Sequence, residues 1–309
     1  MALFNILIFP GMLFVGIYTL IMVFIDRKLC ARLQNRQGPP WYQPLADFLK
    51  LIGKETIIPQ DANKKLFPLL PVIAFASVTT AFLYLPIWAS ASLFPFEGDI
   101  ILVLYLLMLP TLCQFLAGWY STSIYAAVGS SRVLTQLFAY EVPLFMSLLS
   151  PALLAGSWSI SAICQYYAIH PLYILINIPA FLVAIVASQG KLERVPFDTP
   201  EAETEIVGGP LVEYSGRLYA IFRMALDSEL LVVCSLLAAI FLPFFTGNVF
   251  ADFALYIAKT LVILFIFAAF RTVMARVRVE QMVAFCWKIL VPVSLVQMVI
   301  NLVVKGVLS

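Results

Sequence analysis

Long runs without charged side chains limit what this chain can fold into. No Asp, Glu, Lys or Arg occurs from Val142 to Gly190, and other long stretches are almost as free of charge. A membrane-spanning helix needs about 20 apolar residues. Hydrophobic residues make up 62% of the 309 residues and charged residues 12%, whereas soluble domains are about 45–50% apolar and about 25% charged. The chain is therefore expected to be an all-α integral membrane protein, a single polytopic domain over residues 1–309.

The apolar runs predict eight transmembrane helices. The charge-free run after Glu141 is too long for one helix, so Gly156–Ser159 and His170-Pro171 are placed in a loop. The first run lacks a basic start and is long enough to span, so it is expected to be a helix rather than a cleaved signal. Between the third and fourth helices, Trp119–Arg132 is expected to be a polar loop. The eight helices are placed roughly at Leu3–Ile25, Leu66–Trp88, Ile100–Gly118, Leu134–Leu154, Leu172–Ser188, Leu230–Phe245, Phe253–Phe270 and Val283–Val304.

The basic residues predict the orientation. Of 19 Lys and Arg, only Lys259 and Lys305 fall outside alternate loops. By the positive-inside rule those loops, about 26–65, 190–228 and 271–283, are cytoplasmic and both termini lie outside. In the first loop, Leu45, Phe48, Leu49 and Ile52 share one helical face. This pattern predicts a short amphipathic helix in the membrane interface, with a soluble connecting helix as the alternative.

The loop Gly190–Leu226 is unusually acidic for a link between membrane helices. Its acids are Glu193, Asp198, Glu201, Glu203, Glu205 and Glu213. Thr199 and Pro200 suit the first positions of a helix, whose first turns would hold Glu201, Glu203 and Glu205. Acids suit a helix start, but Glu201 and Glu205 would repel each other there, and close carboxylates raise one another's pKa values. Two interpretations stay open: a proton path or cavity lining, and a solvated acidic face.

A few charged residues fall in or beside predicted membrane helices. Glu141 lies inside the fourth, where a carboxylate costs roughly 2.5 kcal/mol or more. It is either a proton-relay acid or, if that helix starts later, an interfacial residue. Asp227 and Glu229, at the cytoplasmic start of the sixth helix, are candidates to extend the acidic path. Lys259 has the position of a snorkelling lysine, and Lys288 is placed facing the acidic cluster.

The sequence offers no pattern for a metal centre or for catalysis within this chain. Its cysteines lie far apart and form no CxxC pair, whereas iron–sulfur and zinc sites use closely spaced ligands. A single histidine, His170, argues against paired axial haem ligands. No phosphate loop or catalytic triad is present. The net charge of +2 is too small to indicate nucleic-acid binding. We therefore expect no metal, no cofactor and no catalytic residue here.

Two loop motifs resemble a known family. The first comprises Asp26-Arg27-Lys28, Arg32–Pro39, Gln43–Leu51 and Lys54-Glu55, and it is similar to the first cytoplasmic loop of the complex I heel subunit. That subunit is the eight-helix membrane protein that joins the peripheral redox arm to the ion-pumping arm. The signature loop of the same family is resembled by Pro196-Phe197-Asp198, Pro200–Glu203, Glu205 and Glu213–Gly216. With similar residues around Gly129, Tyr140–Val142 and Arg276–Lys288, the resemblance covers nearly the whole chain.

The resemblance implies a coupling role without catalysis in this chain. Together with Asp227 and Glu229, the acids expected on an ion path are Glu141, Glu201, Glu203, Glu205 and Glu213. The residues expected at the junction with the peripheral arm are Arg27, Lys28, Arg36, Asp47, Lys54, Asp198 and Arg217. Iron–sulfur clusters, and in a hydrogenase nickel–iron, would belong to partner subunits.

One departure from the quinone-reducing members separates this chain from them. Gly209–Gly216, GPLVEYSG, is more similar to the membrane-bound hydrogenase relatives, because quinone enzymes usually carry Tyr-Asn or Phe-Asn in place of Pro-Leu. The Gly38–Pro44 link is also compact. Both features favour a ferredoxin-linked, energy-converting complex that reduces protons or sulfur and moves H⁺ or Na⁺.

The expected partners are peripheral hydrogenase-like large and small subunits, a ferredoxin-like Fe–S subunit and antiporter-like membrane subunits, in the plasma membrane of a prokaryote. Three alternatives stay open. The chain is the quinone-site subunit of a complex I-type enzyme that oxidises NADH, a deazaflavin or ferredoxin, or a stand-alone secondary transporter, or a passive anchor without a part in ion transfer.

Overall fold

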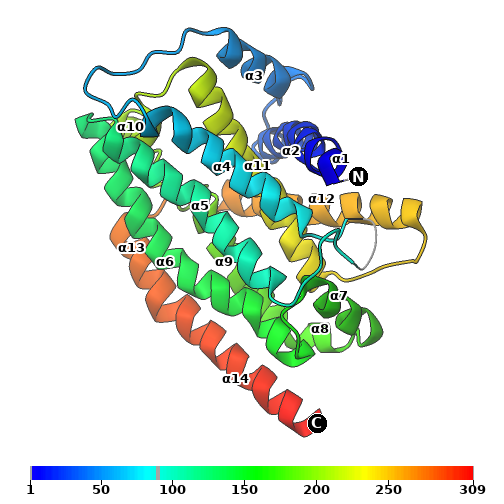
Figure 1. Ribbon diagram of the computed structural model, residues 1–309. Helices are drawn as coiled ribbons and strands as arrows, with labels where there is room; N and C mark the ends of the chain where they lie inside the picture. The colour runs from blue at the N-terminus through cyan, green and yellow to red at the C-terminus, as the bar shows by residue number, and fades with distance from the viewer. Residues whose placement is uncertain (1, 88–90, 309) are drawn as a thin grey trace.

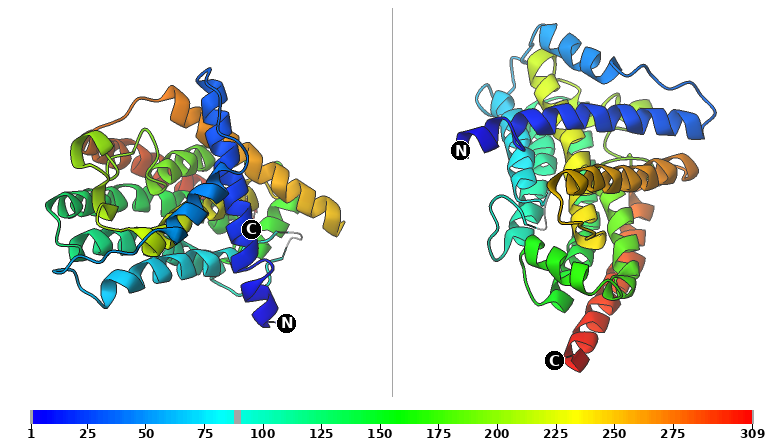
Figure 2. Two further views of the ribbon diagram at one scale, coloured as in Figure 1. Left: turned by 90° about the horizontal axis from the view of Figure 1, so that it is seen from above. Right: turned by 90° about the vertical axis from the view of Figure 1, so that its right-hand side faces the viewer.

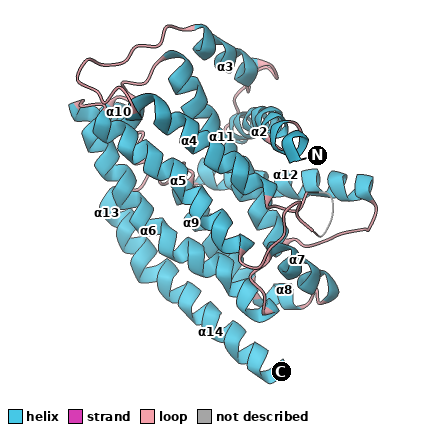
Figure 3. Ribbon diagram, viewed as in Figure 1, coloured by secondary structure: helices cyan, strands magenta, loops and turns pink. Residues whose placement is uncertain are grey.

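The structure, a computed structural model, describes residues 2–87 and 91–308. Helices dominate these ranges and no strand occurs within them (Figure 3). Seven of the helical segments described are long and apolar enough to cross a membrane: Phe4–Leu33, Leu66–Leu83, Asp99–Tyr120, Ile124–Ala155, Gly216–Phe241, Val249–Val273 and Val279–Val307. The prediction of an all-α membrane protein is therefore confirmed.

The elements of these segments carry the labels of Figure 1. The first segment holds α1 (Ala2–Leu7) and α2 (Met12–Leu33). The next three are α4 (Leu66–Leu83), α5 (Asp99–Tyr120) and α6 (Ile124–Ala155). They are followed by α11 (Gly216–Phe241) and α12 (Val249–Val273). The last is α13 (Val279–Phe285), which continues through a π-helical turn (Cys286–Leu290) into α14 (Val291–Leu308).

The predicted fifth span is shorter than expected. Its residues form α8 (Tyr173–Ile176) and α9 (Ile178–Lys191), separated at Asn177 just before Pro179. The 14 residues of α9 reach about 21 Å, less than the roughly 30 Å of a hydrocarbon core. Another short apolar helix, α7 (Ile160–Ile169), precedes it. Length and composition thus give seven spanning candidates, with α9 as a shorter, buried counterpart of the eighth.

Helix α11 forms the centre of the bundle. It contacts α2, α4 and α12, while α4, α5, α6 and α14 follow one another as neighbours and α9 packs on α6. Helices α2 and α12 run side by side across the other face of α11 (Figure 2). Of the apolar window of α11, 83% is buried, so lipid-facing residues come mainly from the surrounding helices.

The segments predicted as cytoplasmic gather at one end of the molecule. Helix α3 (Gln43–Gly53), the short α10 (Glu203–Ile206) and the start of α13 lie at the upper end of Figure 1, and α7 and α8 lie towards the lower end. Helix α3 confirms the predicted helix after Pro44, and its apolar residues Leu45, Leu49 and Ile52 are exposed. The clustering agrees with the predicted sorting of basic loops.

Helix α6 begins ten residues before the predicted fourth span, so Trp119–Arg132 is not an open loop. Only residues 121–123 separate α5 from α6. The segment is polar but carries one charge and no proline, so nothing in it stops a helix. Gly118 and Gly129 allow both helices to approach Pro210, because a Cβ at either position would lie within 2.8 Å of Pro210 atoms. The error came from equating polar with non-helical.

Helix α11 begins at Gly216, so the acidic loop ends ten residues earlier than predicted. Gly216 has φ +58° and lies against the backbone of Glu55, whose carbonyl oxygen would be 2.6 Å from an added Cβ. No helix starts at Thr199, contrary to the prediction. Its hydroxyl instead donates to Gln136 Oε1 at 2.5 Å, within the bundle. The acids after Pro200 therefore do not share a helix face.

A buried polar cluster joins α14 to α6 and to the α8–α9 turn. Asn301 is fully buried and its amide nitrogen donates to the Ser150 carbonyl and hydroxyl, both at 2.8 Å, and to Asn177 Oδ1 at 2.7 Å. Gln297 donates to the Ile176 carbonyl at 2.7 Å. These bonds fix the last helix at one depth along its neighbours.

Candidate functional site

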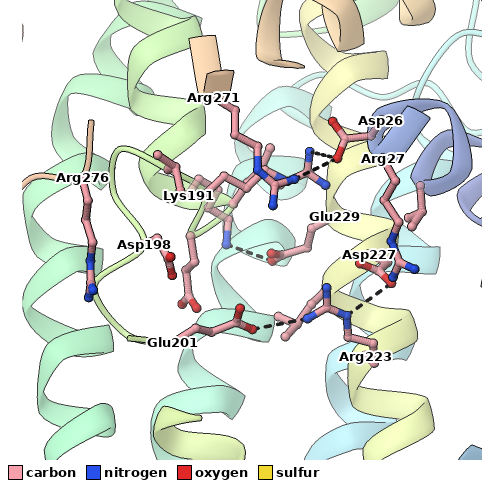
Figure 4. A pocket seen from close by; sticks show the side chains of 16 residues that line it. Asp26, Arg27, Lys191, Asp198, Glu201, Arg223, Asp227, Glu229, Arg271 and Arg276 are labelled. Carbon is pink, nitrogen blue, oxygen red and sulfur yellow. Dashed lines mark hydrogen bonds and ion pairs between the residues drawn. The ribbon is translucent and has the colours of Figure 1, made fainter. Parts of the chain in front are cut away.

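A cavity of about 450 Å³ opens among α2, the segment after α9, α11 and the link between α12 and α13 (Figure 4). Its charged lining residues balance, six acids against six bases. The acids are Asp26, Glu193, Asp198, Glu201, Asp227 and Glu229, and the bases are Arg27, Lys191, Arg194, Arg223, Arg271 and Arg276. Such a density of charge inside an apolar bundle requires pairing, because an isolated buried charge is strongly unfavourable.

Asp26 holds the wall of the cavity together. Its carboxylate, 2% exposed, lies 3.0 Å from Arg194 Nη1 and 3.2 Å from Arg271 Nη1. It therefore links α2 to the segment after α9 and to the end of α12. Removing one partner of a buried pair typically costs 3–5 kcal/mol, so this three-way contact is a structural requirement for the cavity.

Lys191 and Glu229 form a second buried ion pair at the inner end of the cavity. Each side chain is 2% exposed, and Lys191 Nζ lies 2.9 Å from Glu229 Oε1. The same nitrogen donates to Thr111 Oγ1 at 2.6 Å. Lys191 also lines a small hollow between α5, α6 and α9 that contains Glu141. The ammonium therefore lies between the charged cavity and the acid inside α6.

Glu193 lies beside this pair and has an altered proton affinity. Gln114 Nε2 donates to its Oε2 at 2.8 Å. Burial, followed by the negative charge of Glu201, raises the pKa of Glu193 from 4.5 to about 8. A carboxyl with a pKa near neutrality can both accept and release a proton under cellular conditions. The Glu193 side chain is thus a strong candidate for proton exchange.

The outer part of the cavity carries a more exposed cluster. Arg223 Nη1 lies 3.3 Å from Glu201 Oε1, and Arg223 Nε lies 3.5 Å from Asp227 Oδ2, one turn further along α11. Arg223 and Glu201 are 38% and 39% exposed. Ion pairs with this exposure contribute little to stability, so these side chains are free to rearrange.

The predicted ion-path acids do not all lie together. Glu201, Asp227 and Glu229 line the cavity, whereas Glu141 lines the adjoining small hollow. Glu205 points elsewhere: it lies 2.6 Å from Arg132 and 3.7 Å from Arg276 in a second hollow.

The Arg132 guanidinium, which bonds to Glu205, holds the pKa of that carboxyl below its usual value. Glu213 is partly buried next to α11 and is not among the lining residues of the cavity. The Glu203 side chain lies outside the described part of the structure.

The predicted junction residues divide into a cavity group and a surface group. Arg27 and Asp198 line the cavity, and Arg27 Nη1 also pairs with Asp47 Oδ2 of α3 at 3.0 Å. The Lys28 ammonium lies 5.9 Å from the Phe24 ring centroid. The exposed members are Arg36, Lys54 and Arg217.

Sequence reasoning missed several cavity residues and misplaced Lys288. Asp26, Lys191, Glu193, Arg194 and Arg271 all adjoin the ends of membrane helices, and that position was the one signal available for them. Lys288 does not face the acidic cluster, contrary to the prediction.

Lys288 is exposed on the outer side of the last helix because the helix turns that side away from the bundle. At the other end, Lys259 donates to the Phe244 carbonyl and lies 4.4 Å from the Phe245 ring centroid. In the described ranges, no three His, Cys, Asp or Glu side chains are arranged to hold a metal ion.

A fold of this kind around a charged cavity defines a membrane subunit of a complex I-like oxidoreductase, and comparisons with known proteins support this class. The family model described as NADH dehydrogenase matches residues 5–302. This chain belongs to that family, which confirms the resemblance seen in the sequence.

Two relatives from bacteria are similar along most of their length. A membrane subunit of the NADH-quinone oxidoreductase of Dehalococcoides mccartyi (strain CBDB1) is 34% identical over 294 residues, covering 93% of this chain and 83% of the relative. The corresponding NADH-quinone oxidoreductase subunit of Thermus thermophilus is 36% identical over 297 residues, covering 92% and 81%.

A solved structure shares the fold. A chain of the membrane-bound sulfane sulfur reductase, an archaeal respiratory membrane complex, superposes with a TM-score of 0.83 at 26% identity. The match covers 94% of this chain and 96% of that chain. The homologues are thus subunits of multisubunit membrane oxidoreductases.

Proposed function

We propose that this chain is the anchoring and coupling subunit of a ferredoxin-linked, ion-translocating oxidoreductase. In this proposal a peripheral arm related to [NiFe]-hydrogenases reduces protons or sulfur, and this chain links that reaction to H⁺ or Na⁺ movement through antiporter-like subunits. The chain itself catalyses no step. The structural likeness to a chain of a sulfur-reducing complex and the Pro-Leu pair in the acidic loop support this choice within the family.

The observation that carries the proposal is the position of Lys191. Its ammonium contacts Glu229 at 2.9 Å in the cavity and lines the hollow that holds Glu141. A change of charge in the cavity therefore acts on the membrane-embedded acid through one side chain. Coulombic interactions in such a low-dielectric setting are far stronger than in water. We infer that Glu201, Asp227, Glu193 and Glu229 relay charge changes towards Glu141.

The remaining predicted acids take other places in the proposal. Glu205 and Glu213 lie off this direct line, and they stay predictions as members of the ion path. Arg36, Lys54 and Arg217, exposed near α3 and the start of α11, are proposed to contact the peripheral arm. The predicted basic loops face the cytoplasm in this proposal, with both termini outside.

The Glu141→Gln variant tests the relay. In the intact complex, electron transfer from ferredoxin should persist while the number of ions moved per electron falls strongly, because the amide cannot accept a proton at neutral pH. Glu97→Gln, at an exposed acid before α5, is the matched control and should leave the ratio unchanged. Full pumping by the Glu141 variant would favour a passive anchor.

A second candidate is the quinone-site subunit of a complex I-type enzyme. The names of the relatives at 33–36% identity favour it, because they are quinone oxidoreductase subunits. Mild solubilisation and affinity purification of the chain separate the two. Co-purified nickel and Fe–S subunits without quinone reduction would support a hydrogenase, and Fe–S subunits without nickel or quinone reduction would support a sulfur-reducing complex. Reduction of added quinone would support the second candidate, and a chain purified alone would support a stand-alone transporter.

A further inference from the structure

A second hollow, apart from the charged cavity, concentrates guanidinium groups at the start of the last membrane segment. It has a volume of about 470 Å³ and is lined by Arg132 of α6, by Glu205, and by Arg276, Arg278 and Glu280 around the start of α13. Three arginines against two acids leave one excess positive charge. The hollow is therefore suited to an anion.

Most of the hydrogen-bonding capacity of these arginines is unused. Arg132 bonds through Nη1 alone, to Glu205 Oε2 at 2.6 Å and to the Thr199 carbonyl at 3.4 Å. Arg276 approaches Glu205 at 3.7 Å, and Arg278 forms no ion pair with any side chain that the structure describes. A guanidinium carries five N–H donors. Glu205 thus orients two arginines while their other donors stay available to a ligand.

An apolar groove continues directly from this hollow. It is lined by Thr135 of α6 and by a stripe along one side of α13 and the π-helical turn: Val279, Glu280, Val283, Ala284, Trp287 and Lys288. Val279 and Glu280 line both hollows. Residues four apart lie on one helix face, and the small Ala284 and Thr135 leave the space between α6 and α13.

The two hollows meet where the chain enters the membrane. The arginines precede the apolar segment Val279–Val307, and the groove follows its first turns. Lys288 is exposed nine positions after Val279, about 14 Å along the helix. A lysine at that depth is costly against bare hydrocarbon unless its ammonium reaches an anion near the surface. Trp287, 49% exposed beside it, is a residue type enriched at membrane interfaces.

We propose that the two hollows form one binding site for an anionic phospholipid. The phosphate binds to Arg132, Arg276 and Arg278, and one acyl chain lies in the groove between Thr135 and Trp287. Planar guanidinium groups fit phosphate oxygens in paired hydrogen bonds, and a groove with almost no polar lining fits a hydrocarbon chain. A soluble anion would fill the first hollow and leave the second empty, so the contiguity of the two favours a lipid.

Lipid retention by the intact complex tests the site. The complex is purified in mild detergent, delipidated, and reconstituted with phosphatidylglycerol or with phosphatidylcholine, and retained lipid is counted by native mass spectrometry. We expect one phosphatidylglycerol to be retained in preference to phosphatidylcholine. The Arg276→Gln/Arg278→Gln variant should weaken retention at least about ten-fold, because charge-assisted hydrogen bonds are lost. Arg32→Gln, at an exposed arginine on α2, is the matched control.

The groove is tested separately from the headgroup site. Ala284→Phe should fill the groove and reduce retention, whereas Val296→Phe, on the exposed face of α14, should not. Phosphatidylglycerol with brominated acyl chains should quench a tryptophan emission component that Trp287→Phe removes.

Equal retention of both lipids would overturn the proposal, as would retention unaffected by either site variant. Displacement of the lipid by inorganic phosphate would identify a simple anion site, and a partner helix cross-linked to position 284 would identify a protein interface. Either result would also overturn it.

Discussion

The Lys191–Glu229 pair predicts a stability change that can be worked out from its geometry. Lys191→Met removes an ammonium 2.9 Å from a carboxylate, and both side chains are only 2% exposed. The variant leaves the Glu229 carboxyl buried without its partner and also removes the 2.6 Å bond to Thr111. Breaking a buried pair from one side costs about 3–5 kcal/mol. We expect the free energy of unfolding to fall by that amount.

Replacing both partners should behave differently. In Lys191→Met/Glu229→Met no buried charge is left unpaired, and such apolar replacements are often neutral or stabilising. The free energy of unfolding of the double variant should therefore return close to that of the native chain, although ion coupling should be lost. Reversible unfolding by SDS in mixed micelles measures the single variants and the double variant as a cycle.

The control and the refuting result are both defined by exposure. Lys64→Met, at an exposed lysine in the loop before α4, should change stability by no more than about 0.5 kcal/mol. A loss below about 1 kcal/mol for Lys191→Met would refute the reasoning. A double variant as unstable as the single one would refute it as well, because the cost would then come from lost packing.

Two further predictions follow from Glu193 and from the packing of α6. Because burial raises the pKa of Glu193 from 4.5 to about 8, the folded state binds the extra proton between these values, so stability should fall as pH rises from 4.5 to 8 and level off above. Glu193→Gln should remove that slope, as measured by unfolding at several pH values, and an unchanged slope would contradict the assignment. Gly129→Ala places a Cβ 2.6 Å from the Pro210 nitrogen and should cost about 1–3 kcal/mol. Gly53→Ala, with no atom within 4 Å, should be neutral or slightly stabilising, and equal effects of the two alanines would show that the α6 contact is not tight.

Hydropathy predicted most of the membrane helices because their middles carry no competing signal. The runs that became α4, α5 and α12 are apolar throughout, so the requirement for internal backbone hydrogen bonds in lipid left one solution. The same reasoning failed at α11. Its first half holds Arg223, Asp227 and Glu229, which look like loop residues in one dimension. In the structure they point into the cavity and pair with partners from other segments.

The candidate site was predictable in kind but not in arrangement. The acids of the loop after α9 were expected to act together, yet Glu201 and Glu205 face different hollows. What separates them is the absence of a helix at Thr199, whose hydroxyl bonds to Gln136 of α6. A long-range contact of that kind leaves no local pattern. The basic partners Arg194 and Arg271 were likewise hidden, because each finds Asp26 only through the packing of three helices.

The bonds of Asn301 have a consequence for biogenesis. Helix α14 is synthesised after α6 and α9, so its amide meets Ser150 and Asn177 only once those helices are already in the membrane. A helix inserted one turn too high or too low would strand this amide in hydrocarbon, where an unsatisfied polar group costs several kcal/mol. The contact therefore acts as a proofreading step, which rejects bundles whose final helix has been inserted at the wrong depth.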